Sequence, residues 1–299
     1  MMPSNINAFV VNGQTTDIPP RHTYIIVEST YNGQVQLPNG ILYIKFEDHF
    51  DTPVTLPDTV VSVQFGHYYN QQTTFPPSIA HIIFGAYYDH PTIFPDNIQT
   101  ITFGARYNQP TIIPPSAIRV AFGGYFNNDV YIENSHNLNT ISFGYSYNRP
   151  LVLPKNIKHV SFGHSYNQYT ILPDGIQSAI FGDCFDQPVT LPSSVVRLNL
   201  GRMFNQPTTV LPPYLEYLTI GDLMINIITT YPTSIKCLIA LNWGYINSSI
   251  EQQLLSNYNI VFASLSNMAV YKHAHCNTHN IKIKSLSLVD LMLSYVNEQ

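Results

Sequence analysis

LPKNIKHVSFGHSYNQYTI, residues 153–171, is one copy of a unit that is repeated along most of the chain. The next copy, LPDGIQSAIFGDCFDQPVT, follows directly as residues 172–190. The repeat length can be measured from the aromatic residue before the repeated Gly. Its copies are Phe65, Phe84, Phe103, Phe122, Phe143, Phe162 and Phe181. The spacing is 19 residues at every step except the one from Phe122 to Phe143, which is 21. Repeats of this length indicate a solenoid in which each coil packs on its neighbours.

Each unit contains one short strand. Val160 and Phe162 are two positions apart and therefore lie on the same face of a strand, with Ser161 on the other face. The following Gly permits a tight turn, and the Pro of the next unit begins an extended return segment. The short unit leaves little room for a helix on the return. We therefore expect a β-rich, leucine-rich-repeat-like, right-handed coil of about 12 short repeats, with a parallel sheet on the concave face and an extended convex side.

Two columns after the repeated Gly are restricted in residue type. The fourth residue after the Gly position is Asn or Asp in every copy: Asn32, Asp51, Asn70, Asp89, Asn108, Asn127, Asn148, Asn167, Asp186 and Asn205. Both residue types offer a side-chain oxygen, whereas only Asn has an amide donor. We therefore expect a structural ladder whose side chains accept backbone N–H bonds at the turns, within or between coils. The residue before each of them is Tyr or Phe, which predicts a buried stack of rings.

The pattern L-P-x-x-I-x-x-V-x-F-G-x-x-Y/F-N-Q-P resembles the FNIP repeat, a leucine-rich-repeat relative common in social amoebae and in giant viruses that infect amoebae. The resemblance covers roughly residues 20–245, and its signature stands intact at Tyr107–Pro110 and Phe204–Pro207. It implies a leucine-rich-repeat-like fold and protein binding. This unit is shorter than is usual in the family, so we expect short loops. The repeats begin by about residue 22, so we expect no F-box, the N-terminal ubiquitin-ligase adaptor segment of many family members.

The composition excludes several classes of protein. Charged residues make up 10% of the chain, the formal net charge is −5, and the scattered Lys and Arg argue against nucleic-acid binding. Three cysteines are too few for a disulfide framework and favour a reducing compartment. We find neither a signal peptide nor an apolar run of about 18 to 20 residues that could span a membrane. We expect a soluble cytoplasmic protein, in the host cytoplasm if it is viral, with the virion as the alternative location.

The ends of an open solenoid need caps, because a terminal coil would otherwise expose its core. The chain divides into an N-terminal cap, the repeat solenoid and a C-terminal α/β cap, at residues 1–20, 21–244 and 245–299 respectively. Phe9, Val10 and Val11 form the apolar part of the first cap. The last cap is predicted from a capping box at 248–251, a strand at 259–264 and a final helix that starts at Ser287. A separate effector domain at 245–299 is the alternative.

One strand column alternates with the core and is expected to be exposed on the concave face. It carries a basic residue on every second coil, flanked by two tyrosines, and the row comprises Tyr43, His81, Arg119, His159, Arg197 and Tyr217. Neighbouring strands lie about 4.8 Å apart, so the basic groups are expected at steps of roughly 10 Å. This row suits an extended partner with spaced acidic groups. A solvated surface with scattered charges is the alternative.

A stretch near the C-terminus contains four potential zinc ligands within seven residues: His273, His275, Cys276 and His279. Their spacing matches no standard zinc finger, and no second pair of ligands lies nearby in the sequence. We therefore expect a polar surface loop and no bound metal. His81 and His159 are four coils apart, and at that distance they cannot share a metal ion.

Enzyme signatures are missing: the chain has no G-x-S-x-G, no phosphate-cradling Gly loop and no H-E-x-x-H, and no cofactor is expected. Cys184, next to Asp183, could act as a nucleophile only if a His approached it, and a structural thiol is favoured. Asp183 and Asp186 could mimic a glycosidase pair. However, Asp186, like Asp51 and Asp89, occupies the turn position that Asn fills in other copies.

The sequence therefore favours a non-enzymatic protein–protein interaction scaffold that binds a protein partner on the concave sheet face. One alternative is a structural component of a viral particle or assembly, in which the uncharged surface packs against copies of itself. A further alternative is a β-helix enzyme that acts on polysaccharide. That class requires three strands per coil and clustered carboxylates.

Overall fold

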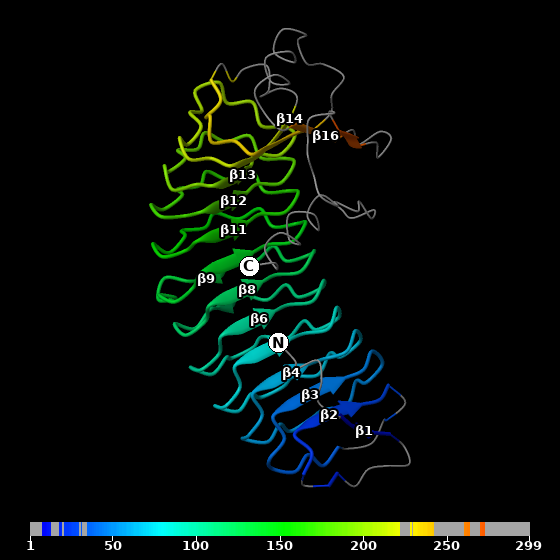
Figure 1. The fold of residues 1–299 in the computed structure, drawn as a ribbon. Helices are drawn as coiled ribbons and strands as arrows, with labels where there is room; N and C mark the ends of the chain where they lie inside the picture. The colour runs from blue at the N-terminus through cyan, green and yellow to red at the C-terminus, as the bar shows by residue number, and fades with distance from the viewer. Residues whose placement is uncertain are drawn as a thin grey trace.

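The computed structural model describes residues 8–12, 18–19, 21–29, 31, 35–221, 228, 230–241, 260–263 and 270–272. Successive coils stack on one another, and each coil adds one strand to a single 15-stranded sheet (Figure 1). Its strands are, in spatial order, β1 (Phe9–Val11), β2 (Tyr24–Val27), β3 (Tyr43–Phe46), β4 (Ser62–Gln64), β5 (His81–Ile83), β6 (Thr100–Thr102), β8 (Arg119–Ala121), β10 (Thr140–Ser142), β11 (His159–Ser161), β12 (Ser178–Ile180), β13 (Arg197–Asn199), β14 (Tyr217–Gly221), β15 (Cys237–Leu241), β16 (Ile260–Ala263) and β17 (Val270–Lys272). Neighbouring strands are parallel except β16 and β17, which are antiparallel.

The return side of each coil is mostly extended chain. Among the described residues, only β7 (Thr111–Ile112) and β9 (Val130–Tyr131) pair there, as a parallel two-stranded sheet. No helix occurs in the described residues, and so none there is long and apolar enough to cross a membrane. The predicted β-rich solenoid, with a parallel sheet and an extended return, is confirmed at about 11 turns. The three strands per coil that a β-helix enzyme requires are not found in the described coils.

The core contains two columns of stacked rings. One column begins at Phe46 and continues through the Phe residues that precede the repeated Gly, as far as Phe181. Successive rings in this column stack at centroid distances of 4.9–5.8 Å. A second column of Tyr and Phe runs beside it, with rings stacked at 5.6–6.3 Å between Phe50 and Tyr69 and from Tyr88 to Phe204. The ring stack predicted from the sequence is therefore present and buried.

The turns are joined from coil to coil by the Asn and Asp column, here called the Asn/Asp ladder. The backbone N–H of Asn70 donates to Oδ1 of Asp51 at 2.8 Å, and Asn70 in turn accepts from the N–H of Asp89 at 3.0 Å. The same bond recurs up to the pair of Asp186 and Asn205. Each side-chain oxygen therefore holds the next coil, which explains why the column needs an acceptor and tolerates either residue. Asn32 lies outside the described residues.

The two ends of the solenoid can be compared with the predicted caps only where the structure describes them. The apolar segment Phe9–Val11 forms β1 and pairs in parallel with β2, so it begins the sheet itself. The strand predicted at 259–264 corresponds to β16, and the antiparallel β17 was not anticipated. The predicted capping box at 248–251 and the helix from Ser287 lie outside the described residues.

Candidate functional site

The sheet face carries the row of side chains that the sequence singled out. Strand register aligns Tyr43, Ser62, His81, Thr100, Arg119, Thr140, His159, Ser178, Arg197 and Tyr217 as consecutive partners. Basic residues therefore do occur on every second strand from β5 to β13. Arg119 is exposed, whereas His81, His159 and Arg197 are half-buried.

The two histidines of this row differ electrostatically from the two arginines. Partial burial lowers the pKa of His81, whose Nδ1 lies 2.8 Å from Oγ1 of Thr100. Burial also lowers the pKa of His159, and the positive charges of Arg197, Arg119 and Lys158 lower it further. Both imidazoles are therefore neutral at neutral pH. Of the four basic residues expected from the sequence, only the arginines carry charge in the free protein.

A second outward row lies beside the first on the same strands. From β3 to β13 it contains Lys45, Gln64, Ile83, Thr102, Ala121, Ser142, Ser161, Ile180 and Asn199, and the next register position, Thr219 in β14, is buried. Neither row includes a carboxylate from β3 to β14. At the far end, the guanidinium carbon of Arg197 lies 4.9 Å from the centroid of the Tyr217 ring, so this cation is held over an aromatic face. The sheet face is thus sparsely but uniformly positive.

A second cluster of reactive side chains lies just beyond the strands, where the chain turns. His164 stacks on Tyr145 of the preceding coil at 4.6 Å, and its Nδ1 lies 3.4 Å from Oδ2 of Asp183 in the following coil. The other ring nitrogen, Nε2, lies 3.5 Å from Sγ of Cys184. Tyr145, His164, Asp183 and Arg202 line an open groove of about 490 Å³.

A nucleophilic Cys184 needs a nearby His, and His164 was not identified as that residue from the sequence. The signal was available in the repeat itself, because residues 19 or 20 positions apart are neighbours in adjacent coils. The other carboxylate considered there, Asp186, belongs to the Asn/Asp ladder. It accepts from the N–H of Asn205 and from Nε2 of Gln206, each at 2.8 Å. A glycosidase pair of Asp183 and Asp186 is therefore not supported by these contacts.

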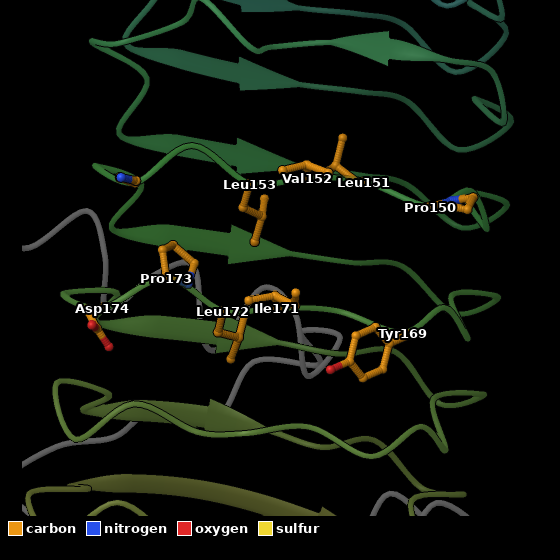
Figure 2. A pocket seen from close by; sticks show the side chains of 10 residues that line it. Pro150, Leu151, Val152, Leu153, Tyr169, Ile171, Leu172, Pro173 and Asp174 are labelled. Carbon is orange, nitrogen blue, oxygen red and sulfur yellow. The ribbon is translucent and has the colours of Figure 1, made fainter.

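The return side carries an exposed apolar surface that was not predicted from the sequence. Five consecutive coils expose a large apolar side chain there, with between 50% and 92% of its surface accessible, and this apolar stripe comprises Ile93, Ile112, Tyr131, Val152 and Ile171. A groove of about 840 Å³ runs between two of the coils and is lined by Val152, Leu153, Tyr169, Ile171, Lys155 and Asp174, among others (Figure 2). The signal was the second residue of Thr-Ile-Phe-Pro (92–95) and of Leu-Val-Leu-Pro (151–154), because alternate side chains of an extended segment point outward.

The described residues contain no group of three or more His, Cys, Asp or Glu side chains that could hold a metal ion. The stretch with His273, His275, Cys276 and His279 lies outside the residues that the structure describes. Its predicted role as a surface loop stays a prediction.

The fold and its repeat define a leucine-rich-repeat-like solenoid. The family model for the FNIP Repeat matches residues 69–104, 147–184 and 185–223, so the chain carries FNIP repeats, as its sequence pattern predicted. No curated protein sequence matches the chain.

Two solved structures match the chain. One is CroV588, described as a novel circular LRR protein structure and originating from a giant virus, with 23% identity and a TM-score of 0.50 over 83% of this chain and 50% of that one. This chain therefore spans about half the length of CroV588. The other is YopM from Yersinia enterocolitica WA-314, with 11% identity and a TM-score of 0.29 over 77% of each chain.

Proposed function

We propose that this protein is a non-enzymatic scaffold whose sheet face binds an extended acidic segment of a protein partner. Leucine-rich-repeat-like scaffolds commonly mediate protein–protein interaction. The observation that supports this face is its charge: Arg119 and Arg197 stand in register on one outward row, and neither outward row carries a carboxylate from β3 to β14. Four strand steps separate the two arginines, or about 19 Å. Carboxylates at that separation on an extended peptide would meet both.

The repeated architecture favours this role energetically. The Asn/Asp ladder and the stacked rings fix each coil to the next, so the side chains of the sheet face are held in place before a partner arrives. A preorganised surface loses little conformational entropy on binding. The neutral histidines add a second effect, because a partner carboxylate beside His159 would favour protonation of its ring. Binding should therefore strengthen as the pH falls from 7 to 6.

Charge reversal of the two arginines tests this proposal. Arg119→Glu with Arg197→Glu should abolish binding of a poly-glutamate peptide and deplete partners captured from cells. The matched control is Arg106→Glu with Arg149→Glu, which makes the same change in net charge away from the two outward rows and from the apolar stripe, and should leave both readouts unchanged. If the sheet-face variant retains the peptide and every captured partner, the proposed binding face is wrong.

A second candidate function is self-assembly through the apolar stripe, which a specific observation favours. The stripe is uncharged along five coils, and Lys155 and Asp174 stand beside its groove at equivalent positions of consecutive coils. A twofold axis that crosses the stripe between these two coils would place Lys155 of each copy opposite Asp174 of the other. Such a surface is self-complementary, as a homodimer interface must be.

Sedimentation over a range of concentrations tests this candidate. The wild type should associate as concentration rises, Ile171→Lys should stay monomeric, and the matched Ile83→Lys on the sheet face should associate like the wild type. A wild type that stays monomeric at all concentrations rules out self-assembly and leaves the scaffold proposal unaffected. We also propose a cytoplasmic location, because three cysteines are too few for the disulfide framework of a secreted domain.

A further inference from the structure

We propose that Cys184 is a reactive thiol and a site of covalent modification by small disulfides and other soft electrophiles, with His164 as its base and Asp183 as the residue that orients this base. Nucleophilic thiols in proteins share this arrangement, in which a base contacts the nucleophile and a third group fixes the base. The arrangement comprises three side chains from two adjacent coils. It is separate from the sheet-face row and from the apolar stripe.

The geometry assigns one role to each atom. Oδ2 of Asp183 lies 3.4 Å from Nδ1 of His164, within ion-pair distance, and a carboxylate beside this nitrogen favours the tautomer with its proton on Nδ1 and a free lone pair on Nε2. Nε2 faces Sγ of Cys184 at 3.5 Å, within hydrogen-bond distance for sulfur. Tyr145 stacks on the imidazole at an interplanar angle of 6°, which holds the plane of the ring. The base is therefore positioned on three sides.

The architecture does not require any of these three residues. In neighbouring coils, the position of His164 and Asp183 is occupied by Gly124, Tyr145 and Arg202. The position of Cys184 is occupied by Ser146, Ser165 and Met203. A column that accepts such different side chains is not selected for packing. The combination of Cys, His and Asp occurs at one place in the described coils and is not part of the repeat.

The cluster is open to small molecules. The side chains of His164 and Asp183 are 37% and 39% exposed, and Cys184 is half-buried and forms no disulfide. The charged and titratable groups that face the imidazole are Asp183, Cys184 and Tyr145, and Arg202 of the next coil lines the same groove. A soft electrophile can therefore approach the sulfur while the base stays in place.

The proposed reaction with a low-molecular-weight disulfide, such as glutathione disulfide, is an exchange with no net oxidation. The Cys184 proton moves to Nε2 of His164 as the sulfur attacks one sulfur of the disulfide. The new S–S bond forms on Cys184 and the old S–S bond breaks. The departing thiolate takes the proton back from His164 and leaves as a thiol. Reduction by excess thiol reverses the modification.

Alkylation of the full-length protein by iodoacetamide at pH 7, resolved by mass spectrometry of each cysteine peptide, tests the proposal. We expect Cys184 to react at least tenfold faster than Cys237, and His164→Asn to remove about tenfold or more of the Cys184 rate, as loss of a general base does. Added free imidazole should restore part of that rate. Asp183→Asn should slow the reaction and Asp183→Glu should restore it, whereas Tyr145→Phe keeps the stacked ring and should change little.

Folding does not confound this test, because the His164 column tolerates Gly, Tyr, Asp and Arg in other coils. Equal rates at Cys184 in the wild type and His164→Asn would overturn the proposal. A His164→Asn variant that is slow but does not respond to imidazole would overturn the assigned role of His164 as the base. Glutathione disulfide should then form a mixed disulfide at Cys184 in the wild type, and its absence there would overturn the proposed modification.

Discussion

The hydroxyl group of Tyr166 lies 2.7 Å from Oγ1 of Thr170 inside the ring-stacked core. The Thr170 hydroxyl donates its own proton to the carbonyl of Gln168 at 2.9 Å, so it accepts from the tyrosine. The same pairing occurs at Tyr69 with Thr73, Tyr88 with Thr92, and Tyr107 with Thr111. Where the ring is Phe126 or Phe185, the residue four positions later is Val130 or Val189, respectively. In these six coils the ring and its partner change together, from Tyr–Thr to Phe–Val, whereas Phe204 is followed by Thr208.

This pairing predicts strong coupling between Tyr166 and Thr170. Thr170→Val alone leaves the buried tyrosine hydroxyl without an acceptor and should lower the free energy of unfolding by about 1–3 kcal/mol. Tyr166→Phe alone should cost about 1 kcal/mol. The double variant reproduces the natural Phe126–Val130 pair and should lie closer to the wild type than the sum of the two. Urea unfolding of all four proteins measures the coupling, and strictly additive losses would contradict it.

Tyr147 departs from this pairing, because Leu151 stands where the coils of Tyr69, Tyr88, Tyr107 and Tyr166 have Thr. Its hydroxyl is buried with no hydrogen-bond partner among the described residues, and burial raises its pKa. Tyr147→Phe removes an unsatisfied polar group and should raise the free energy of unfolding by about 1 kcal/mol. Tyr166→Phe, the same substitution at a satisfied site, should lower it. Thermal unfolding of the two variants shows whether the two substitutions change the stability in opposite directions.

The buried tyrosines also predict a loss of stability at alkaline pH. Burial raises the pKa of Tyr107 and of Tyr166 from 10.0 to about 12. Between these values the unfolded chain loses the phenol proton while the folded chain retains it, so stability is complete below pH 10 and falls as pH rises toward 12. Each tyrosine should contribute a slope of about −1.4 kcal/mol per pH unit. Tyr107→Phe with Tyr166→Phe should flatten the profile of unfolding free energy between pH 10 and 12, and an unchanged slope would refute this origin.

The repeat let the sequence predict most of the architecture, because a property shared by ten copies of a column is a property of the coil. The acceptor role of Asn70 and its equivalents and the ring stack through Tyr107 followed from residue types alone. The Tyr–Thr pairing shows in the spacing of Tyr166 and Thr170, but it was not predicted, because Tyr and Phe interchange in the ring column. The structure shows that it has a dedicated partner.

The candidate sites were harder to predict, because they depend on side-chain direction and burial. The alignment of Arg119 with Arg197 follows from the repeat register, whereas the neutral state of His159 depends on burial and on the cations around it. The contact between His164 and Cys184 joins neighbouring coils, and the register gives their proximity but not that the two side chains point toward each other. The apolar stripe was missed because no face was assigned to the return segment.

Gly123 and Gly124 are adjacent in sequence and should respond to the same substitution with opposite sign. A Cβ atom at Gly123 would overlap the carbonyl oxygen of Gly104 in the preceding coil, whereas a Cβ at Gly124 meets nothing within 4 Å. Neither has a positive φ, so alanine is not strained at either position. Gly123→Ala must push two coils apart and should lower the unfolding free energy by about 1–3 kcal/mol, the typical cost of overpacking. Gly124→Ala restricts only the unfolded chain and should raise it by about 0.4–1 kcal/mol. Urea unfolding of both variants measures the difference, and equal effects would show that the close approach of the coils does not explain the repeated Gly.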